Sequence, residues 1–406
     1  MLRANSLLYA VYICLIVSIL CGALLYYANL YNQLNLFYNT REDLYIQNQS
    51  AVNFALGNSL SDINESLESP SGVSSSIHIK PHGLLDLLLV QSSIHTDTIT
   101  SAHFVGRYGT EDFAIYLSNF SKGLSFGGQV KLIGNKKLPT KHIREEYLSN
   151  TAGKLISTGD VALSDIIMPK IDSRFATLFN HSFTQKISLK DVVKRNDSVY
   201  FNSFLSETIE IELLEPFLNN VVIKGNFVLN AKDSIVVGSK AVLEDVILKA
   251  PVVRFQEDFS GNVQVFSTKK INLERGVQLL YPSVLCLNNS SLEKSQIKVG
   301  ENCRVYGAIV QFGNKLTRIE ENETILKENT LLVGDIYCSG KLMVGGKVYG
   351  SIYTNRFFHK TDFGIHNNCI INAEVDCSKR PKYFVSVPLL ENTNIQPRYA
   401  IQKKVL

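Results

Sequence analysis

The chain has 406 residues, of which 45% are hydrophobic and 19% charged, so it can build a core in two or three domains and is not disordered. Its net charge of +4 is small for this length and gives no support for nucleic-acid binding, which needs a concentrated basic surface. Tryptophan is absent while Tyr (18) and Phe (21) are plentiful, a composition that favours strands.

The first element is an apolar helix. No charged side chain occurs between Arg3 and Arg41, and the most apolar part runs from Leu7 to Ala28. These residues, about 22 in number, are enough to cross a hydrocarbon layer of ~30 Å. Tyrosines gather near both ends, as interfacial aromatic residues do. We therefore predict a single transmembrane span.

A cleaved signal peptide is the alternative to an anchor. It would need a basic start, a shorter apolar core and a small-residue cleavage site. Here only Arg3 is basic and Cys21-Gly22-Ala23 is followed by further apolar residues, so we favour an uncleaved anchor. The short N-terminal tail favours a cytoplasmic N-terminus, which predicts an inner-membrane protein with most of the chain on the periplasmic side.

The helix is predicted to continue beyond the membrane, from about Asn5 to Leu56, over roughly 78 Å. Apolar residues keep helical spacing along one stripe of this extension, and Gly57 is a suitable stop. The stripe consists of Leu30, Leu34, Phe37, Leu44, Ala51 and Ala55. The second half of the helix is expected to pack its stripe on the folded domain or on a partner helix. We predict that Leu30, Leu34, Phe37 and Leu44 bind a partner helix or a second copy of the chain.

The rest of the chain is predicted to be mainly β. Residues 58–76 are polar, with Pro70, Gly72 and three consecutive serines, and are expected to form a flexible linker. Residues 77–195 alternate short apolar runs with glycine-containing turns, which indicates an antiparallel β-rich module. The predicted organisation has three further parts. Residues 1–57 are the anchor helix, residues 196–380 are a repeat domain, and residues 381–406 are a C-terminal tail.

The second half of the chain contains repeats. Offsetting the sequence by 36 residues superposes Gly225 on Gly261 and Ile235 on Ile271, among other matches. Later the step shortens to six residues, as in Gly334, Gly340 and Gly346 or in Ile336, Leu342 and Val348. A short strand plus a turn repeated at this step predicts a β-helix, a solenoid in which each face supplies an inward apolar side chain. Ile336, Leu342 and Val348 are expected to stack inward on one face. Ordinary hairpins with accidental spacing are the alternative.

The segment VGDIYCSGKLMVGGKVYGSIYTN resembles the repeats of bactofilins, polymer-forming cytoskeletal proteins. The likeness extends over residues 297–376 and, more loosely, over residues 221–287. It implies a compact right-handed β-helix. Because this chain adds a membrane span and a preceding β module, the resemblance does not imply filament formation.

The N-terminal layout resembles that of minor pilins and pseudopilins. A span runs directly into an amphipathic helix that ends in NQSAVNFALGN, similar to the stretch that closes the long helix in those proteins. The signature for prepilin peptidase, a Gly before the mature Phe or Met and a Glu five residues later, is missing. The resemblance therefore implies the architecture and leaves processing open.

We looked for sites of catalysis and metal binding. Gly123-Leu124-Ser125-Phe126-Gly127 spells the G-x-S-x-G elbow of serine hydrolases, but a strand and not a helix is expected after it. His78 and His82 have the helical spacing of metal ligands, but Pro81 excludes a helix, so both are expected at the surface. The acidic run Glu320, Glu321 and Glu323 is expected to be a solvated turn. We expect no catalytic residue, metal or cofactor.

Five cysteines lie outside the apolar segment, namely Cys286, Cys303, Cys338, Cys369 and Cys377. No pair has the C-x-x-C spacing of a metal knuckle or redox motif. One disulfide is conceivable, but buried free thiols in a β core are favoured.

These observations predict a membrane-anchored structural or assembly protein of the bacterial cell envelope, in pilus-like or secretion machinery. Its expected partners are the membrane and proteins bound through the N-terminal helix, with no nucleic acid. The alternative is a membrane-tethered β-helix that binds or cleaves glycans. That reading would need exposed tyrosines, of which Tyr306, Tyr337, Tyr349 and Tyr353 are candidates, or clustered carboxylates, whereas Asp245, Asp258, Asp335 and Glu374 occur singly.

Overall fold

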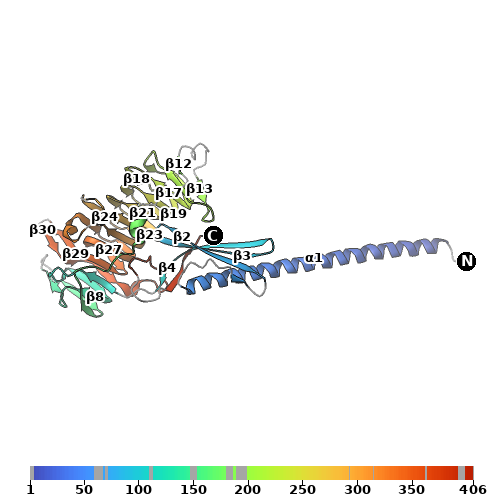
Figure 1. The fold of residues 1–406 in the computed structure, drawn as a ribbon, viewed down its shortest axis with the longest axis horizontal. Helices are drawn as coiled ribbons and strands as arrows, with labels where there is room; N and C mark the ends of the chain where they lie inside the picture. Colours follow the sequence, from blue (N-terminus) through green and yellow to red (C-terminus); the bar gives the residue numbers. More distant parts are fainter. Residues whose placement is uncertain are drawn as a thin grey trace. The chain divides into compact units, whose positions relative to one another are not determined.

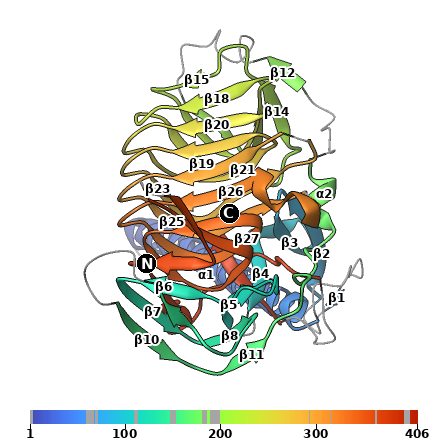
Figure 2. The same cartoon turned by 90° about the vertical axis from the view of Figure 1, so that its left-hand side faces the viewer.

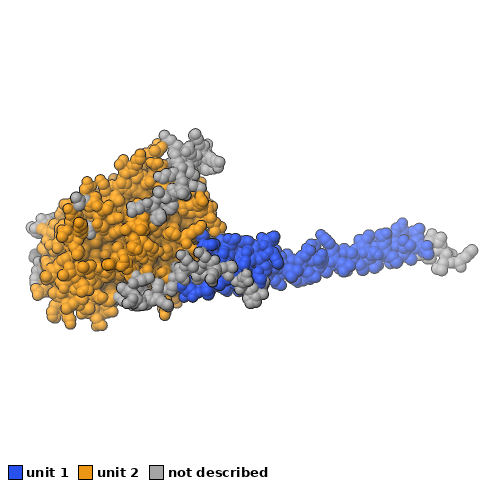
Figure 3. Space-filling model, in the orientation of Figure 1, with its two compact units in different colours: residues 1–78, 89–101 blue, residues 79–88, 102–406 orange. Residues whose placement is uncertain are grey.

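The structure is a computed structural model that describes most of the chain. The described residues are 4–58, 67–68, 72–108, 113–146, 153–179, 186–188, 199–291, 293–313, 315–361, 364–391 and 398–405. The chain forms two compact units, coloured separately in Figure 3. The first contains Met1–His78 and Leu89–Ser101, and the second contains Ile79–Leu88 and Ala102–Leu406.

The predicted long helix is confirmed. Helix α1 runs over Ala4–Gly57, 54 residues without a proline, and is the long blue helix of Figure 1. At 1.5 Å per residue it is about 80 Å long. Among the described residues it is the one helix that is long and apolar enough to cross a membrane. The chain therefore has one candidate membrane span, at its N-terminal end.

A five-stranded sheet has the strand order β1-β2-β3-β4-β33. Its strands are β1 (Leu67–Glu68), β2 (Ser74–His82), β3 (Leu85–Ile94), β4 (Asp97–Tyr108) and β33 (Arg398–Lys404). The last serines of the predicted linker belong to strand β2. The Ser74 hydroxyl is hydrogen-bonded to the Ser93 hydroxyl of β3 at 3.1 Å. The Ser75 hydroxyl is likewise bonded to the Ser92 hydroxyl at 2.7 Å. Most of the predicted linker, residues 59–66 and 69–71, lies outside the described residues.

The large sheet of the second unit has 25 strands. Its early strands are β5 (Phe113–Leu117), β7 (Gln129–Ile133), β8 (Asn135–Leu138), β10 (Lys154–Thr158), β11 (Val161–Leu163), β12 (Lys186–Ser188) and β13 (Val199–Asn202). The next are β14 (Ile209–Glu212), β15 (Phe217–Leu218), β16 (Val222–Gly225), β17 (Phe227–Asn230), β18 (Ser234–Val237), β19 (Val242–Lys249), β20 (Val252–Phe255), β21 (Ser260–Ser267) and β22 (Lys270–Leu273). The last are β23 (Gln278–Asn288), β24 (Ser295–Val299), β25 (Arg304–Phe312), β26 (Asn322–Leu326), β27 (Leu331–Val344), β28 (Lys347–Tyr349), β29 (Ile352–Thr361), β30 (Gly364–Asn367) and β32 (Glu374–Asp376).

Smaller elements complete the described chain. A separate three-stranded sheet joins β31 (Cys369–Ile371), β6 (Ser125–Gly127) and β9 (Arg144–Glu145). The short helices are α2 (Arg174–Thr177), η1 (Leu316–Glu321) and η2 (Cys377–Lys379).

Parallel pairing dominates the large sheet. In its central part each strand pairs with the strand two positions further along the chain, for example β18 with β20 and β20 with β22 (Figure 2). Leu229 pairs with Leu248, and Leu248 pairs with Val265. The 36-residue offset seen in the sequence therefore spans two pairing steps.

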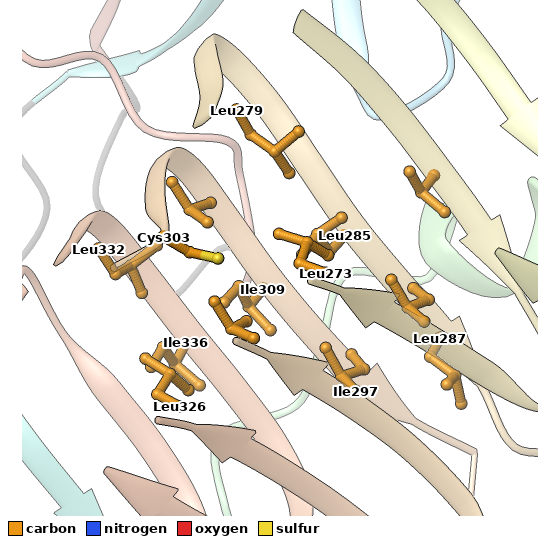
Figure 4. Packing of buried hydrophobic residues seen from close by; sticks show 14 of the residues in the cluster. Leu273, Leu279, Leu285, Leu287, Ile297, Cys303, Ile309, Leu326, Leu332 and Ile336 are labelled. Atoms are coloured by element: carbon orange, nitrogen blue, oxygen red, sulfur yellow. The ribbon is translucent and has the colours of Figure 1, made fainter. Parts of the chain in front are cut away.

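The core of the second unit consists of columns of apolar side chains across successive strands. Leu285, Ile309 and Ile336 form one such column, on β23, β25 and β27 (Figure 4). All three are 0% exposed. In short strands such as β18 and β22, buried and less buried residues alternate. Strand β21, in contrast, is buried from Gly261 to Ser267.

The six-residue repeat is confirmed as a pattern of buried residues but its stacking is corrected. Ile336, Leu342 and Val348 are all buried, as predicted. They do not stack on one another, however, because strand neighbours are separated by more than six residues. Each stacks in a different column: Ile336 on Ile309 and Ile352, Leu342 on Thr324 and Phe357, and Val348 on Leu332 and Val375.

The predicted antiparallel arrangement of the first β-rich segment is wrong between residues 113 and 163. Strand β5 pairs in parallel with β29, and β7 pairs in parallel with β32 and β10. These strands continue the ladders formed by the C-terminal part of the chain. Short apolar strands separated by glycines have the same local pattern in both arrangements, and only distant partners decide between them.

Candidate functional site: the N-terminal helix

The apolar stripe of α1 divides into an exposed and a buried part. Leu30, Leu34 and Phe37 are 44%, 49% and 46% exposed, whereas Leu44 is 1% exposed. Ala51 and Ala55 further along are buried as well. The structure therefore separates Leu44 from the other three predicted partner-binding residues, because its side chain is already covered within the chain. Partner binding by Leu30, Leu34 and Phe37 stays a prediction.

Asn48 fixes the buried half of the helix. Its side-chain amide donates to the backbone carbonyl of Val90 at 3.0 Å and to the Ser92 hydroxyl at 3.3 Å, and its oxygen accepts from Ser101 at 2.7 Å. Asn48 is buried, and satisfying a buried amide in this way selects one position of the helix on β3 and β4. The sequence analysis missed this residue, although a polar side chain four residues after Leu44 in an apolar stripe was a usable signal.

The exposed half of helix α1 ends near two aromatic residues, Phe37 and Tyr38. The Arg41 guanidinium lies 5.9 Å from the centre of the Phe37 ring, which also meets Tyr38 edge-on at 6.0 Å. Arg41 is the first charged residue after Arg3. From Leu7 to Asn39 the uncharged part of α1 is exposed, and such an apolar surface is suited to lipid and to other helices.

The G-x-S-x-G motif has no elbow geometry. Ser125 begins β6, and strand β7 follows where a hydrolase would have a helix. The Ser125 hydroxyl donates to Glu146 at 2.5 Å, and Glu146 in turn lies 3.0 Å from Nδ1 of His366. Burial acts to raise the pKa of Glu146, but the hydrogen bonds from Ser125 and His366 lower it overall. The serine is therefore bonded to a carboxylate and not to an imidazole base.

Of the two histidines near Pro81, the expected surface position holds for His78 and is wrong for His82. The His82 ring is buried between Phe104 and Phe204, at centroid distances of 5.5 and 5.0 Å, and its Nε2 is 3.2 Å from the carbonyl oxygen of Asp245. Burial lowers its pKa to about 4. Among the described residues no group of three or more His, Cys, Asp or Glu side chains is arranged to hold a metal ion.

The tyrosines proposed for a glycan-binding ladder are not exposed as a set. Tyr337 and Tyr353 are buried, 6.5 Å apart, and Tyr353 also stacks on Tyr116 at 6.2 Å. The Tyr337 hydroxyl donates to the carbonyl of Pro169 at 3.2 Å. Tyr306 and Tyr349 are half-buried. Stacking on a sugar would require open ring faces, which Tyr337 and Tyr353 lack.

The acidic run lies beside basic side chains of the large sheet. Glu320 forms ion pairs with Lys341 on β27 and Arg356 on β29, so this residue of the expected solvated turn contacts neighbouring strands.

Four cysteines are buried free thiols, as predicted: Cys286, Cys303, Cys338 and Cys369. Burial raises the pKa of Cys303 to about 11 and of Cys338 and Cys369 to about 12, which disfavours their thiolate forms at neutral pH.

No family model and no curated protein matches this chain. Among solved structures, the competence-associated pilin ComZ from Thermus thermophilus aligns over 84% of this chain and 86% of its own, with 10% sequence identity and a TM-score of 0.21. A TM-score this low does not establish a common fold.

Proposed function

We propose that this chain is a membrane-anchored structural protein of the bacterial cell envelope, which joins an assembly such as pilus-like or secretion machinery through its N-terminal helix. One observation carries the proposal: residues 4–40 of α1 have no charge, and residues 7–39 are exposed over more length than a membrane can cover. The exposed residues span about 50 Å, against ~30 Å of hydrocarbon. Roughly 20 Å of helix is left for another binding partner.

The chemistry of the remaining segment supports a helical partner. Leu30, Leu34 and Phe37 lie on one face at helical spacing. The other positions hold five amide side chains (Asn29, Asn32, Gln33, Asn35 and Asn39) together with Tyr31, Leu36 and Tyr38. An apolar stripe of this kind is covered either by lipid or by another helix. The segment is too polar on its remaining faces to lie within hydrocarbon, so the proposed occupant is a helix of a partner protein or of a second copy.

The parallel ladders support a structural role for the second unit. We infer that the strands wind as a β-helix, because each central strand pairs in parallel with the strand two positions on and the apolar columns continue from strand to strand. Such stacking would give a stiff body with a broad surface, suited to assembly contacts. On this proposal the protein is not an enzyme, lies in the inner membrane, and holds its β-rich part in the periplasm.

Charged substitutions in the exposed stripe test the proposal. Leu34→Lys and Phe37→Glu are expected to abolish crosslinking of the full-length protein to partners or to itself in cells, because a buried helix–helix contact cannot accommodate an unpaired charge. Both residues lie outside the buried part of α1, so the melting temperature in detergent should change little. Asn39→Lys is the matched control, since it adds a charge on the opposite face and should leave crosslinking intact.

Two results would contradict the proposal. A wild-type protein that is strictly monomeric in detergent and forms no crosslink in cells has no helix-mediated assembly. Equal loss of crosslinking in Asn39→Lys would mean that charge in the span, and not the stripe, is responsible.

A further inference from the structure

Four polar side chains from distant parts of the chain meet beside strand β33. Lys403 Nζ lies 2.7 Å from Oδ2 of Asp245 and 3.0 Å from Oε1 of Glu244. The other oxygen of Asp245, Oδ1, accepts a hydrogen bond from Asn262 Nδ2 at 2.5 Å. We name these residues, Lys403, Asp245, Glu244 and Asn262, the Lys403 cluster.

Irregularities in two strands bring the cluster together. The pairing of β19 with β21 shifts register between Glu244 and Val246, and Asp245 between them has a φ of 60°. The pairing of β33 with β4 shifts between Ile401 and Lys403. Bulges of this kind re-aim a side chain out of the regular alternation. Here they direct Asp245 and Lys403 towards each other.

The aspartate is held where a charge is costly. Its side chain is 8% exposed, and the carbonyl of the same residue contacts buried His82, whose ring packs against Phe104 and Phe204. Burial raises the pKa of the Asp245 carboxyl, although Lys403 and Asn262 act in the opposite direction. The Lys403 side chain is 25% exposed, so the loss of hydration falls mainly on the Asp245 carboxylate. An ion pair with such a buried member gains little net stability.

We propose that Lys403 and Asp245 condense to form an intramolecular isopeptide bond, with Glu244 carrying the protons. The new bond joins Lys403 Nζ to Cγ of Asp245, and the bond from Cγ to Oδ2 breaks. Of the three ammonium protons one stays on the amide nitrogen, and two pass through Glu244 to Oδ2, which departs as water. The N–H of Asn262 stabilises the negative charge that develops on Oδ1. No oxidant or additional reactant is required.

The arrangement favours this reaction in two ways. Amine and carboxyl are held in contact, so that condensation becomes an intramolecular step. The amide product also removes two opposite charges from a poorly hydrated site. The bond would tie β33 to β19 across 158 residues of chain and would resist the unfolding of the C-terminal strand.

Mass spectrometry of the purified full-length protein tests the proposal. Tryptic digestion should yield one linked peptide pair, containing Asp245 and Lys403, whose mass is lower by one water molecule than the sum of the two peptides. Lys403→Arg keeps the positive charge but cannot form the bond, and Glu244→Gln removes the proton carrier, so both should yield separate peptides. Lys327→Arg, in the exposed Lys327–Glu301 ion pair, is the control and should keep the linked pair.

Two results would overturn the proposal. Only unlinked peptides from the wild-type protein, with intact masses of both regions, would show that the Lys403 cluster is an ordinary ion pair. A linked pair that persists in full in Glu244→Gln would exclude the proton transfer described here. The wild-type measurement decides the first point even if a variant fails to fold.

Discussion

His82 makes the stability of the protein depend on pH. The folded chain keeps this imidazole neutral, because burial lowers its pKa to about 4, whereas in the unfolded chain its pKa is near the ordinary value of 6.5. Below pH 6.5 the unfolded state therefore binds a proton that the folded state does not bind. The resulting loss of stability begins near pH 6.5 and reaches about 3 kcal/mol by pH 4.

We expect His82→Phe to flatten this dependence. Phenylalanine fits the aromatic surroundings of Phe104 and Phe204 and cannot be protonated, so the variant should lose less stability between pH 6.5 and 4 than the wild type. Thermal melting of the full-length protein in detergent across this range measures the effect. The exposed His78 on the same strand supplies a control, since His78→Gln should keep the wild-type slope. Burial also lowers the pKa of His103 and His359, so a smaller slope should remain.

At the scale of elements, the large sheet depends on columns that cross several strands. Leu342 on β27 is 0% exposed and stands between Thr324 on β26 and Phe357 on β29. A charge at this position would be enclosed by neighbours on both sides. Its two register partners, Thr324 and Phe357, carry no charge that could pair with it.

Leu342→Asp is therefore expected to destabilise the second unit by several kcal/mol, on the order of 3–5. Protease resistance and thermal melting would detect the change. Lys347→Asp, on the neighbouring strand β28, introduces the same side chain at an exposed position and should be close to neutral. Unchanged melting in Leu342→Asp would contradict the assigned strand register.

At the scale of the whole molecule, the proposal predicts the orientation of the chain in the membrane. Ser239 is exposed and follows the span in sequence by about two hundred residues, so it reports the side on which the second unit lies. In Ser239→Cys, a membrane-impermeant maleimide should label the protein once the outer membrane is permeable and the inner membrane is intact. Labelling that requires opening of the inner membrane would reverse the proposed orientation. A mature chain that starts near Tyr26 would instead indicate cleavage of the anchor.

Much of the architecture follows from local patterns. The absence of charge between Arg3 and Arg41 determines the candidate span, and helical spacing from Leu30 to Ala55 determines that α1 continues beyond it. The six-residue repeat likewise identifies buried positions of the strands, namely Ile336, Leu342 and Val348. These features are readable because they depend on a residue's near neighbours and on the periods of the helix and the strand.

The remaining features depend on partners that are distant in sequence. Only the tertiary structure buries Leu44 while leaving Leu34 exposed, because the covering depends on where strands β3 and β4 meet Asn48. It alone decides that β5 pairs in parallel with β29, and that Lys403 meets Asp245. Periodicity specifies which face of an element is apolar, but it does not specify which element covers that face. The physical reason is that the spacing of apolar residues along an element depends only on local backbone geometry, whereas the contacts of each side chain depend on the path of the whole chain.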